Sequence, residues 1–155
     1  MNMYPIYQWF DDTAIGHFIA GNTWAFPLTE TFHIMALAVM FGCIFLIDLR
    51  LLGVNFGGIS HARLFRELNR YINWSTVIII VTGIMLFSSE ATKAYENDAF
   101  RPKVVLLILA LIFHYGVFNK AVRNEAVPSN AKLLAWTSLI LWFGVGMAGR
   151  AIGFV

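Results

Sequence analysis

Charged residues are scarce in this 155-residue sequence. They make up 13% of it, against 59% hydrophobic residues, and the mean hydropathy is +0.68. A soluble domain of average composition is about half apolar and about one quarter charged. One small water-soluble core could not bury so much apolar surface, so the composition excludes an ordinary soluble domain. The formal net charge of +2 is too small to indicate a nucleic-acid partner.

Cysteine is almost absent, and so are the marks of a cleaved leader. Cys43 is the only cysteine, which excludes an intramolecular disulfide and a cluster of cysteine metal ligands. It lies in an apolar run, so we interpret it as a small core residue. No Lys or Arg precedes Arg50, so the N-terminus lacks the basic region of a signal peptide. A hydrolase constellation and a glycine-rich nucleotide loop are missing too.

Long apolar segments are abundant instead. About 20 mostly apolar residues cross roughly 30 Å of hydrocarbon. We therefore predict a single all-α domain over residues 1–155, an integral membrane four-helix bundle that begins with an outer-surface arm, residues 1–23. Its four spans are expected at about residues 24–47, 71–89, 102–119 and 133–149.

The segments between the spans are polar. Apolar residues at helical spacing in residues 61–70 predict a short interfacial helix before the second span, with Ser60 as its N-cap. Residues 90–101 are expected to form a loop and residues 120–132 a turn. In the arm, a short helix is expected to run through Phe18 and to begin at one of three residues: Asp11, Asp12 or Thr13.

The positions of Lys and Arg predict the orientation. The linker after the first span contains four Arg residues, and the linker after the third span contains two Lys and one Arg. The arm contains neither. The positive-inside rule places those two linkers in the cytoplasm. Both termini are then expected on the outer, periplasmic side of a bacterial cytoplasmic membrane.

Glu30 and His33 stand out in the first span, because ionisable residues at membrane depth are costly and are candidate functional residues. Three residues apart, they share one helix face. In one interpretation, Glu30 orients His33 and ties the arm to the bundle. In the other, His33 ligates a haem iron, since histidine is a common axial ligand of b-type haem.

His114 lies well inside the third span, with no charged residue within a helical turn. It is either a neutral histidine bonded to a backbone carbonyl or a second haem ligand. Its expected axial offset from His33 is roughly 10 Å at 1.5 Å per residue, which disfavours one haem held by both. Two haems at different depths would use His33 with His17 and His114 with His61. The alternative for His17 and His61 is a solvated histidine near the interface.

Three cations gather at the expected outer end: Arg101, Lys103 and Arg150. They either anchor the helices at the interface by snorkelling or bind haem propionates, a quinone head group or an anionic lipid. Because residues 151–155 continue apolar beyond Arg150, we expect this side chain to face the bundle. The fourth span also carries small residues that permit close helix packing or a flat macrocycle: Gly144, Gly146, Ala148 and Gly149.

Asp48 and Arg50 close the first span at its expected inner end. We interpret them as a structural lock at the interface. In this interpretation their charges pair with each other or with the helix of the first linker.

Short motifs in the spans resemble those of a known family. They are Phe32-His33-Ile34, Leu49-Arg50-Leu51, Arg63-Leu64-Phe65-Arg66, Pro102-Lys103 and His114-Tyr115-Gly116. Over about residues 28–120 they resemble the HemJ family of small bacterial protoporphyrinogen oxidases. The resemblance implies a four-helix membrane protein that binds b-type haem, with His33 and Lys103 in its functional site. The sequence departs from the family's pattern at Asp48 and in its added arm, and fold and cofactor transfer better than substrate does. The layout also resembles small four-span bacterial membrane proteins of unassigned function.

The leading hypothesis is therefore a b-type haem-binding membrane protein with a redox or electron-transfer role, linked to a quinone or a porphyrinogen. It would hold one or two haems through His33 and His114, with Arg101 and Arg150 near the propionates. If it is an enzyme, it is a haem-dependent membrane oxidoreductase with Lys103 as a catalytic residue. The alternative is a cofactor-free accessory or assembly subunit of a larger complex, or a homo-oligomer. Copper handling is a third hypothesis, based on Met35, Met40, Met85 and Met147.

Overall fold

The computed structural model describes residues 4–152, which form helices and no strands. Four helices are long and apolar enough to cross a membrane: α3 (Ala25–Leu51), α4 (His61–Ser89), the continuous run of α6 (Phe100–Ile112), η1 (Phe113–Phe118) and α7 (Asn119–Val122), and α8 (Ala131–Ala151). In the most apolar 18 residues of each helix, at most 33% are buried inside the protein. The remaining apolar surface needs lipid around it. The predicted four-span, all-α architecture is confirmed, and the chain is a multi-pass membrane protein.

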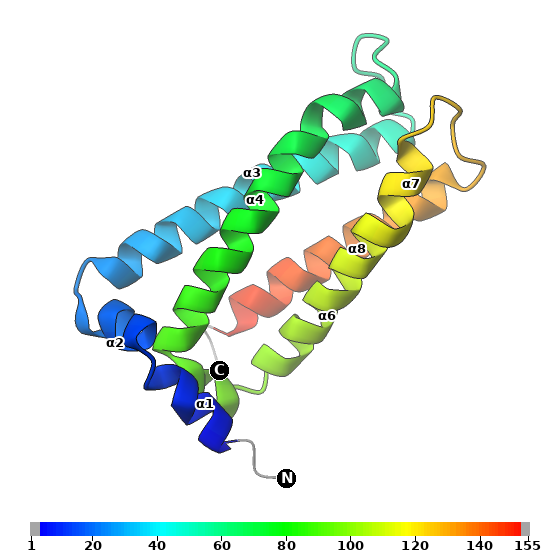
Figure 1. Cartoon of the computed structure of the whole chain (residues 1–155). Coiled ribbons are helices and arrows are strands. Elements are labelled where there is room, and N and C mark those ends of the chain that lie inside the picture. Colours follow the sequence, from blue (N-terminus) through cyan, green and yellow to red (C-terminus); the bar gives the residue numbers. More distant parts are fainter. Residues whose placement is uncertain (1–3, 153–155) are drawn as a thin grey trace.

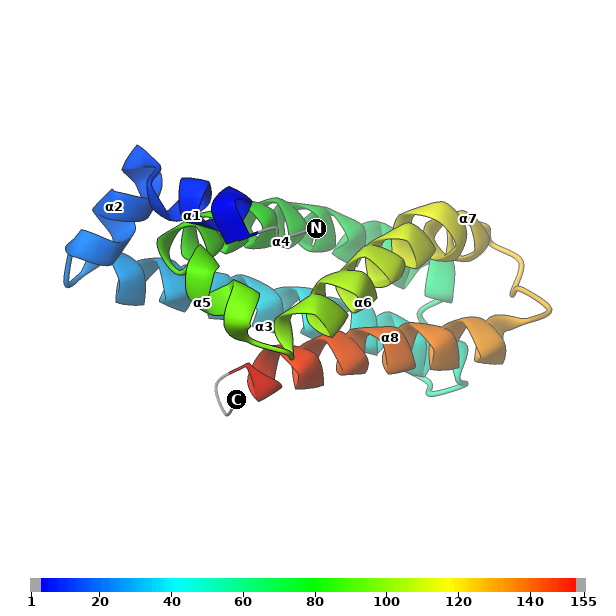
Figure 2. The same ribbon diagram turned by 90° about the horizontal axis from the view of Figure 1, so that it is seen from below.

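The four long helices pack as two pairs. α3 packs along α4, α6 packs along α8, and the contact of α3 with α8 joins the pairs (Figures 1 and 2). By contrast, α4 and α6 hardly pack against each other, although α7 reaches α4 at one end. One of the four seams of the bundle is therefore not closed by helix packing.

The expected interfacial helix is helical but is not a separate element. Residues 61–70 form the first turns of α4, which continues without a break through the second span. The reason is a single buried stripe at seven-residue spacing: Phe65, Ile72 and Ile79 all face the core. The predicted cap is confirmed, because the Ser60 hydroxyl accepts a hydrogen bond from the Arg63 amide at 3.2 Å.

The arm contains two helices, α1 (Tyr4–Asp11) and α2 (Ala14–Gly21). Thr13 begins α2, since its hydroxyl accepts a hydrogen bond from the Gly16 amide at 3.1 Å, so one of the three expected starts is confirmed. The helix ends at Gly21 rather than Phe18, and α1 was not predicted. Gly16 packs directly on the second span: a Cβ there would lie 2.3 Å from the Ser88 carbonyl oxygen.

The prediction of a loop at residues 90–101 is wrong, because a short helix, α5 (Ala91–Glu96), forms there. Asp11 of the arm supplies the missing helix cap. Its carboxylate accepts hydrogen bonds from the backbone amides of Ala91 at 2.6 Å and Thr92 at 3.0 Å. A negative side chain at the first amides of a helix satisfies donors that have no partner within the helix.

The bundle has two distinct ends. At the arm end, α1 packs on α5 and α4, α2 packs on α4 and α3, and the segment after α5 reaches the end of α8, where the Asn97 amide donates to the Ile152 carbonyl at 3.0 Å. At the loop end lie residues 52–60 and 123–130 (Figure 1). The first and last described residues both lie at the arm end, as an even number of spans requires. Which end faces the cytoplasm stays a prediction.

Candidate functional site

His33 is half-buried where α3 faces α4. Its Nδ1 lies 2.8 Å from the hydroxyl oxygen of Thr82, and that hydroxyl lies 2.6 Å from the Ile78 carbonyl. A hydroxyl has one proton, and a carbonyl oxygen can only accept. Thr82 therefore donates to Ile78 and accepts from His33, so Nδ1 carries the imidazole proton. Nε2 is left with its lone pair, which can bind a metal or accept a proton.

Gly83 lets the His33 ring approach the backbone of α4. A Cβ on this glycine would lie 3.3 Å from Cε1 of His33, tighter than an ordinary van der Waals contact. A glycine inside a helix costs about 0.5–1 kcal/mol relative to alanine, so it needs a local reason. The close approach of the imidazole supplies that reason.

Lys103 of α6 is a second ionisable residue in the arm-end half of the bundle. It is half-buried and packs on α8, where a Cβ on Gly149 would lie 3.7 Å from its Cε. It is close enough to His33 for the charges of the two side chains to interact. The arm-end half therefore holds two contacts, His33 with Thr82 and Gly83 between α3 and α4, and Lys103 with Gly149 between α6 and α8.

The orientation of His33 by Glu30 is not observed. Glu30 is exposed and forms no hydrogen bond or ion pair within residues 4–152, whereas Thr82 holds the ring. The expectation that Glu30 orients His33 is wrong.

The two outer arginines are exposed at the arm end of the bundle. Arg101 is exposed, and its guanidinium lies 5.5 Å from the ring centroid of Tyr95 in a cation–π contact with α5. Arg150 is exposed on the last turn of α8, so the expectation that it faces the bundle is wrong.

His17 and His61 lie in different surroundings. His17 is exposed on α2, next to Gly16, which packs on Ser88. Ser88 lies six residues beyond Thr82 on α4, a rise of roughly 9 Å. His61 is buried at the start of α4, and its Nε2 donates to the Asn124 carbonyl at 2.9 Å.

His114 is 1% exposed within η1, a π-helical turn. Its ring stacks on Phe118 at a centroid distance of 5.5 Å and meets Trp142 edge-on at 6.1 Å. Neither ring nitrogen has a hydrogen-bond partner within residues 4–152, so the expected bond to a backbone carbonyl is not present. A π-turn inside a transmembrane helix often marks a functional segment, and a buried polar group without a partner needs an explanation.

His114 lies well away from both His33 and His61 along the bundle axis. Tyr115, its neighbour, places its hydroxyl 3.1 Å from Asn73 and 3.2 Å from Thr76 on α4. Thr82, which holds His33, lies six to nine residues further along α4, a rise of roughly 9–14 Å. This agrees with the expected offset between the two histidines. His61 precedes Asn73 by twelve residues, roughly 18 Å, so the structure does not bring it to His114.

Asp48 and Ser138 form a second buried polar arrangement between α3 and α8. Both are 0% exposed, and the two side chains lie beside each other without a hydrogen bond of normal geometry. The predicted pairing of Asp48 with Arg50 is wrong. Arg50 instead donates to the carbonyls of Ile59 at 2.6 Å and Val54 at 3.3 Å, and so holds the following loop.

The sequence interpretation missed Thr82 and Ser138. Each is a small polar residue in an apolar span, and such residues are common at helix contacts in general. The signal that could have found Thr82 is its position before Gly83, a polar group beside a gap in the side-chain surface. Within the described range 4–152, no three His, Cys, Asp or Glu side chains gather as a metal site. A haem does not need such a cluster, since one or two axial ligands hold its iron.

The comparison with protein families covers almost the whole chain. A family model described as a family of unknown function (DUF6644) matches residues 6–155, from the arm through all four spans. The chain belongs to this family. No match is found among curated proteins or solved structures. Membership in the DUF6644 family shows no link to HemJ and assigns no activity.

Proposed function

We propose that this chain is a b-type haem-binding membrane protein with a redox or electron-transfer role and with His33 as an axial ligand. The observation that carries the proposal is the hydrogen bond from Nδ1 of His33 to Thr82, which leaves the Nε2 lone pair available. Histidines that bind metals almost always donate their other ring N–H to an oxygen acceptor. That bond fixes the tautomer and the ring orientation and raises the basicity of the ligand.

The positive charge at the arm end suits the acidic edge of a haem. Lys103 lies near enough to His33 to act on it electrostatically, and Arg101 and Arg150 lie at the same end of the bundle. Charge-assisted hydrogen bonds from such cations to propionate carboxylates are stronger than neutral ones, and they are favoured where water is scarce. The haem would supply the electron-transfer chemistry, while these residues would supply the axial ligand and the compensating charge.

His114 is the candidate ligand for a second haem. Its two ring nitrogens have no partner within residues 4–152, which is compatible with a ligand role. Phe118 and Trp142 cover the ring, so they would have to move before His114 could bind iron. We therefore assign the first haem to His33. A second haem at His114 would require these aromatic side chains to rearrange.

An electron partner of the quinone or porphyrinogen class would approach from the bilayer. Lys103 is then the residue in the site that offers a cation to a carbonyl or carboxylate of that partner, which would be its role as a catalytic residue. Its half-buried position restricts competing water. Its replacement would weaken the interaction with the partner more than the binding of haem by His33.

An optical spectrum of protein purified from haem-replete cells tests the proposal. We expect Soret and alpha bands in the reduced-minus-oxidised spectrum. His33→Ala should reduce haem occupancy at least tenfold. The matched control is His17→Ala, which removes an exposed histidine at the same end of the bundle and should leave the spectrum unchanged. A colourless but folded preparation would contradict the proposal and support a cofactor-free accessory or assembly subunit.

A further inference from the structure

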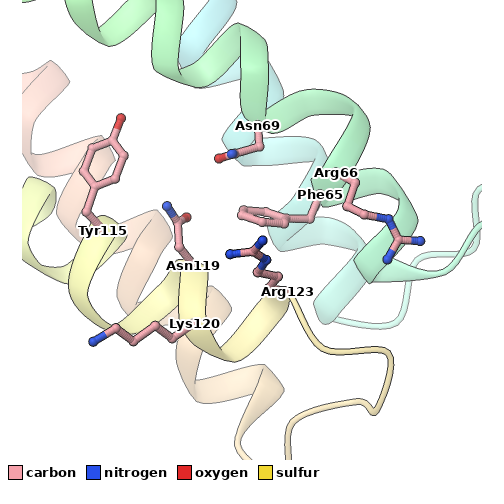
Figure 3. Close-up of a pocket in the computed structure, with 7 residues that line it drawn as sticks. All are labelled: Phe65, Arg66, Asn69, Tyr115, Asn119, Lys120 and Arg123. Atoms are coloured by element: carbon pink, nitrogen blue, oxygen red, sulfur yellow. The ribbon is translucent and has the colours of Figure 1, made fainter.

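A basic pocket lies at the loop end, between α4 and the η1–α7 segment (Figure 3). Its volume is about 410 Å³. Phe65 and Tyr115 contribute aromatic surface, while amides and cations form the rest of the lining: Arg66, Asn69, Asn119, Lys120 and Arg123. It lies far from His33, at the opposite end of the bundle, and has no part in the proposed haem site.

Two amide side chains in this pocket lack partners. Figure 3 shows Asn69 on α4 and Asn119 on α7 directed toward each other across the pocket. The Oδ1 atom of each is buried and accepts no hydrogen bond from any residue in the range 4–152. A buried acceptor that receives no hydrogen bond costs free energy, so two in one pocket indicate a ligand or water that donates to them.

The pocket also has an excess of positive charge. Of its three cations, Arg66 is paired with Glu125 at 2.6 Å. Lys120 and Arg123 form no ion pair with any described residue. Figure 3 shows Arg123 and Lys120 on the same helical segment as Asn119, all three as lining residues of the pocket. The charge therefore favours an anionic ligand that also offers hydrogen-bond donors.

The surroundings of the pocket favour a ligand with an apolar part. The helices α4 and α6, which hardly pack against each other, run from this pocket toward the arm end, beyond the hydrogen bonds of Tyr115 to Asn73 and Thr76. Both helices carry exposed apolar side chains, among them Val77 on α4 and Ile108 and Ile112 on α6. An acyl chain could lie along this surface while the polar head remains at the basic end. Basic sites between helices at a membrane surface are typical positions for anionic lipid head groups.

We propose that this pocket binds the head group of an anionic glycerophospholipid of the phosphatidylglycerol type. Lys120 and Arg123 would pair with its phosphate. Its glycerol hydroxyls would donate to Oδ1 of Asn69 and Asn119. Phosphatidylethanolamine is the less suitable ligand, because its ammonium group cancels the charge of the phosphate. The ammonium group would also be repelled by Lys120 and Arg123, which form no ion pair with any described residue.

Lipid retention by the full chain in detergent tests this proposal. The protein is delipidated, mixed with phosphatidylglycerol or phosphatidylethanolamine, and analysed by native mass spectrometry. We expect at least tenfold tighter binding of phosphatidylglycerol. The double variant Lys120→Gln, Arg123→Gln should lose this preference. The control is Arg63→Gln, which removes an exposed cation at the same end but outside the pocket lining and should retain the preference.

Three results would overturn the proposal. One is equal binding of both lipids by the wild-type chain, and another is equal loss of the preference in the Arg63 control, which would indicate a diffuse charge effect. The third is displacement of the lipid by millimolar glycerol 1-phosphate, which would assign the pocket to a soluble phosphate ester instead. The substituted side chains are exposed, so the variants should stay monodisperse in size-exclusion chromatography and the comparison remains valid.

Discussion

The hydroxyl of Thr82 lies 2.8 Å from Nδ1 of His33, and this one contact determines how the imidazole can be used. Thr82 gives its own proton to the carbonyl of Ile78, so it can only accept from the ring. Thr82 on α4 thus accepts a hydrogen bond from Nδ1 of His33 on α3, which leaves the free lone pair of the imidazole on Nε2. This relationship connects helix packing with the proposed chemistry.

Thr82→Val should test that relationship, because valine keeps the shape of threonine and removes the acceptor. Loss of an outer-shell partner of a metal-binding histidine typically lowers metal affinity by about 10–100-fold. We expect a comparable fall in haem affinity, measured by titration of the apoprotein. Thr76→Val is the control, since Thr76 is also buried on α4 but contacts Tyr115 and not His33. An unchanged affinity in Thr82→Val would remove the main support for His33 as the ligand.

Gly16→Ala should detach the arm from the bundle. The added Cβ would lie 2.3 Å from the Ser88 carbonyl oxygen and 2.8 Å from that of Asp11, and neither backbone atom can move alone. Overpacking of this kind costs about 1–3 kcal/mol. We expect faster hydrogen exchange in α2. Gly21→Ala is the matched control on the same helix, because nothing lies within 4 Å of its added Cβ, and it should leave exchange in α2 unchanged or slower.

Asp11→Ala should uncap α5. The substitution removes the acceptor of the Ala91 and Thr92 amides, and loss of a helix cap costs about 0.5–2 kcal/mol. Hydrogen exchange of the amides at the start of α5 should accelerate by roughly tenfold for each 1.4 kcal/mol lost. Asp12→Ala removes an exposed neighbouring carboxylate and serves as the control. If both variants accelerate exchange equally, the effect comes from net charge and not from the cap.

The four spans could be predicted from the sequence because a long apolar run has one stable solution in a bilayer, a helix. The cap of Thr13 on α2 was also predictable, since the cap and the helix are adjacent in the chain. The helix α5 was not, because Asp11 caps it from 80 residues away. Contacts of that kind depend on how the arm folds back, which no local pattern records.

The candidate site was predictable only in part for a related reason. Hydropathy identifies His33 and Lys103 as polar residues inside spans, and the structure places them near enough for their charges to interact. Hydropathy does not show how each helix is rotated about its axis relative to its neighbour. That rotation decides that Thr82, and not Glu30, meets His33, and that Asp48 faces Ser138 rather than Arg50.

Asp48 offers a test of how the interior tolerates a carboxyl group. Neither of its oxygens has a hydrogen bond of normal geometry, and no described cation pairs with it. An uncompensated charge in an apolar interior is costly, so a carboxyl group without a partner is expected to hold a proton there; Asp48→Asn, which keeps the shape and is also uncharged, should change the free energy of unfolding by less than about 1–2 kcal/mol. Unfolding of the purified protein by a denaturing detergent would measure this.

Ser138→Ala is the companion variant for Asp48→Asn. The serine hydroxyl also lacks a partner within residues 4–152, so its removal should cost less than about 1 kcal/mol. A loss of several kcal/mol in either variant would mean that the pair is compensated by an ordered water or a bound cation between α3 and α8.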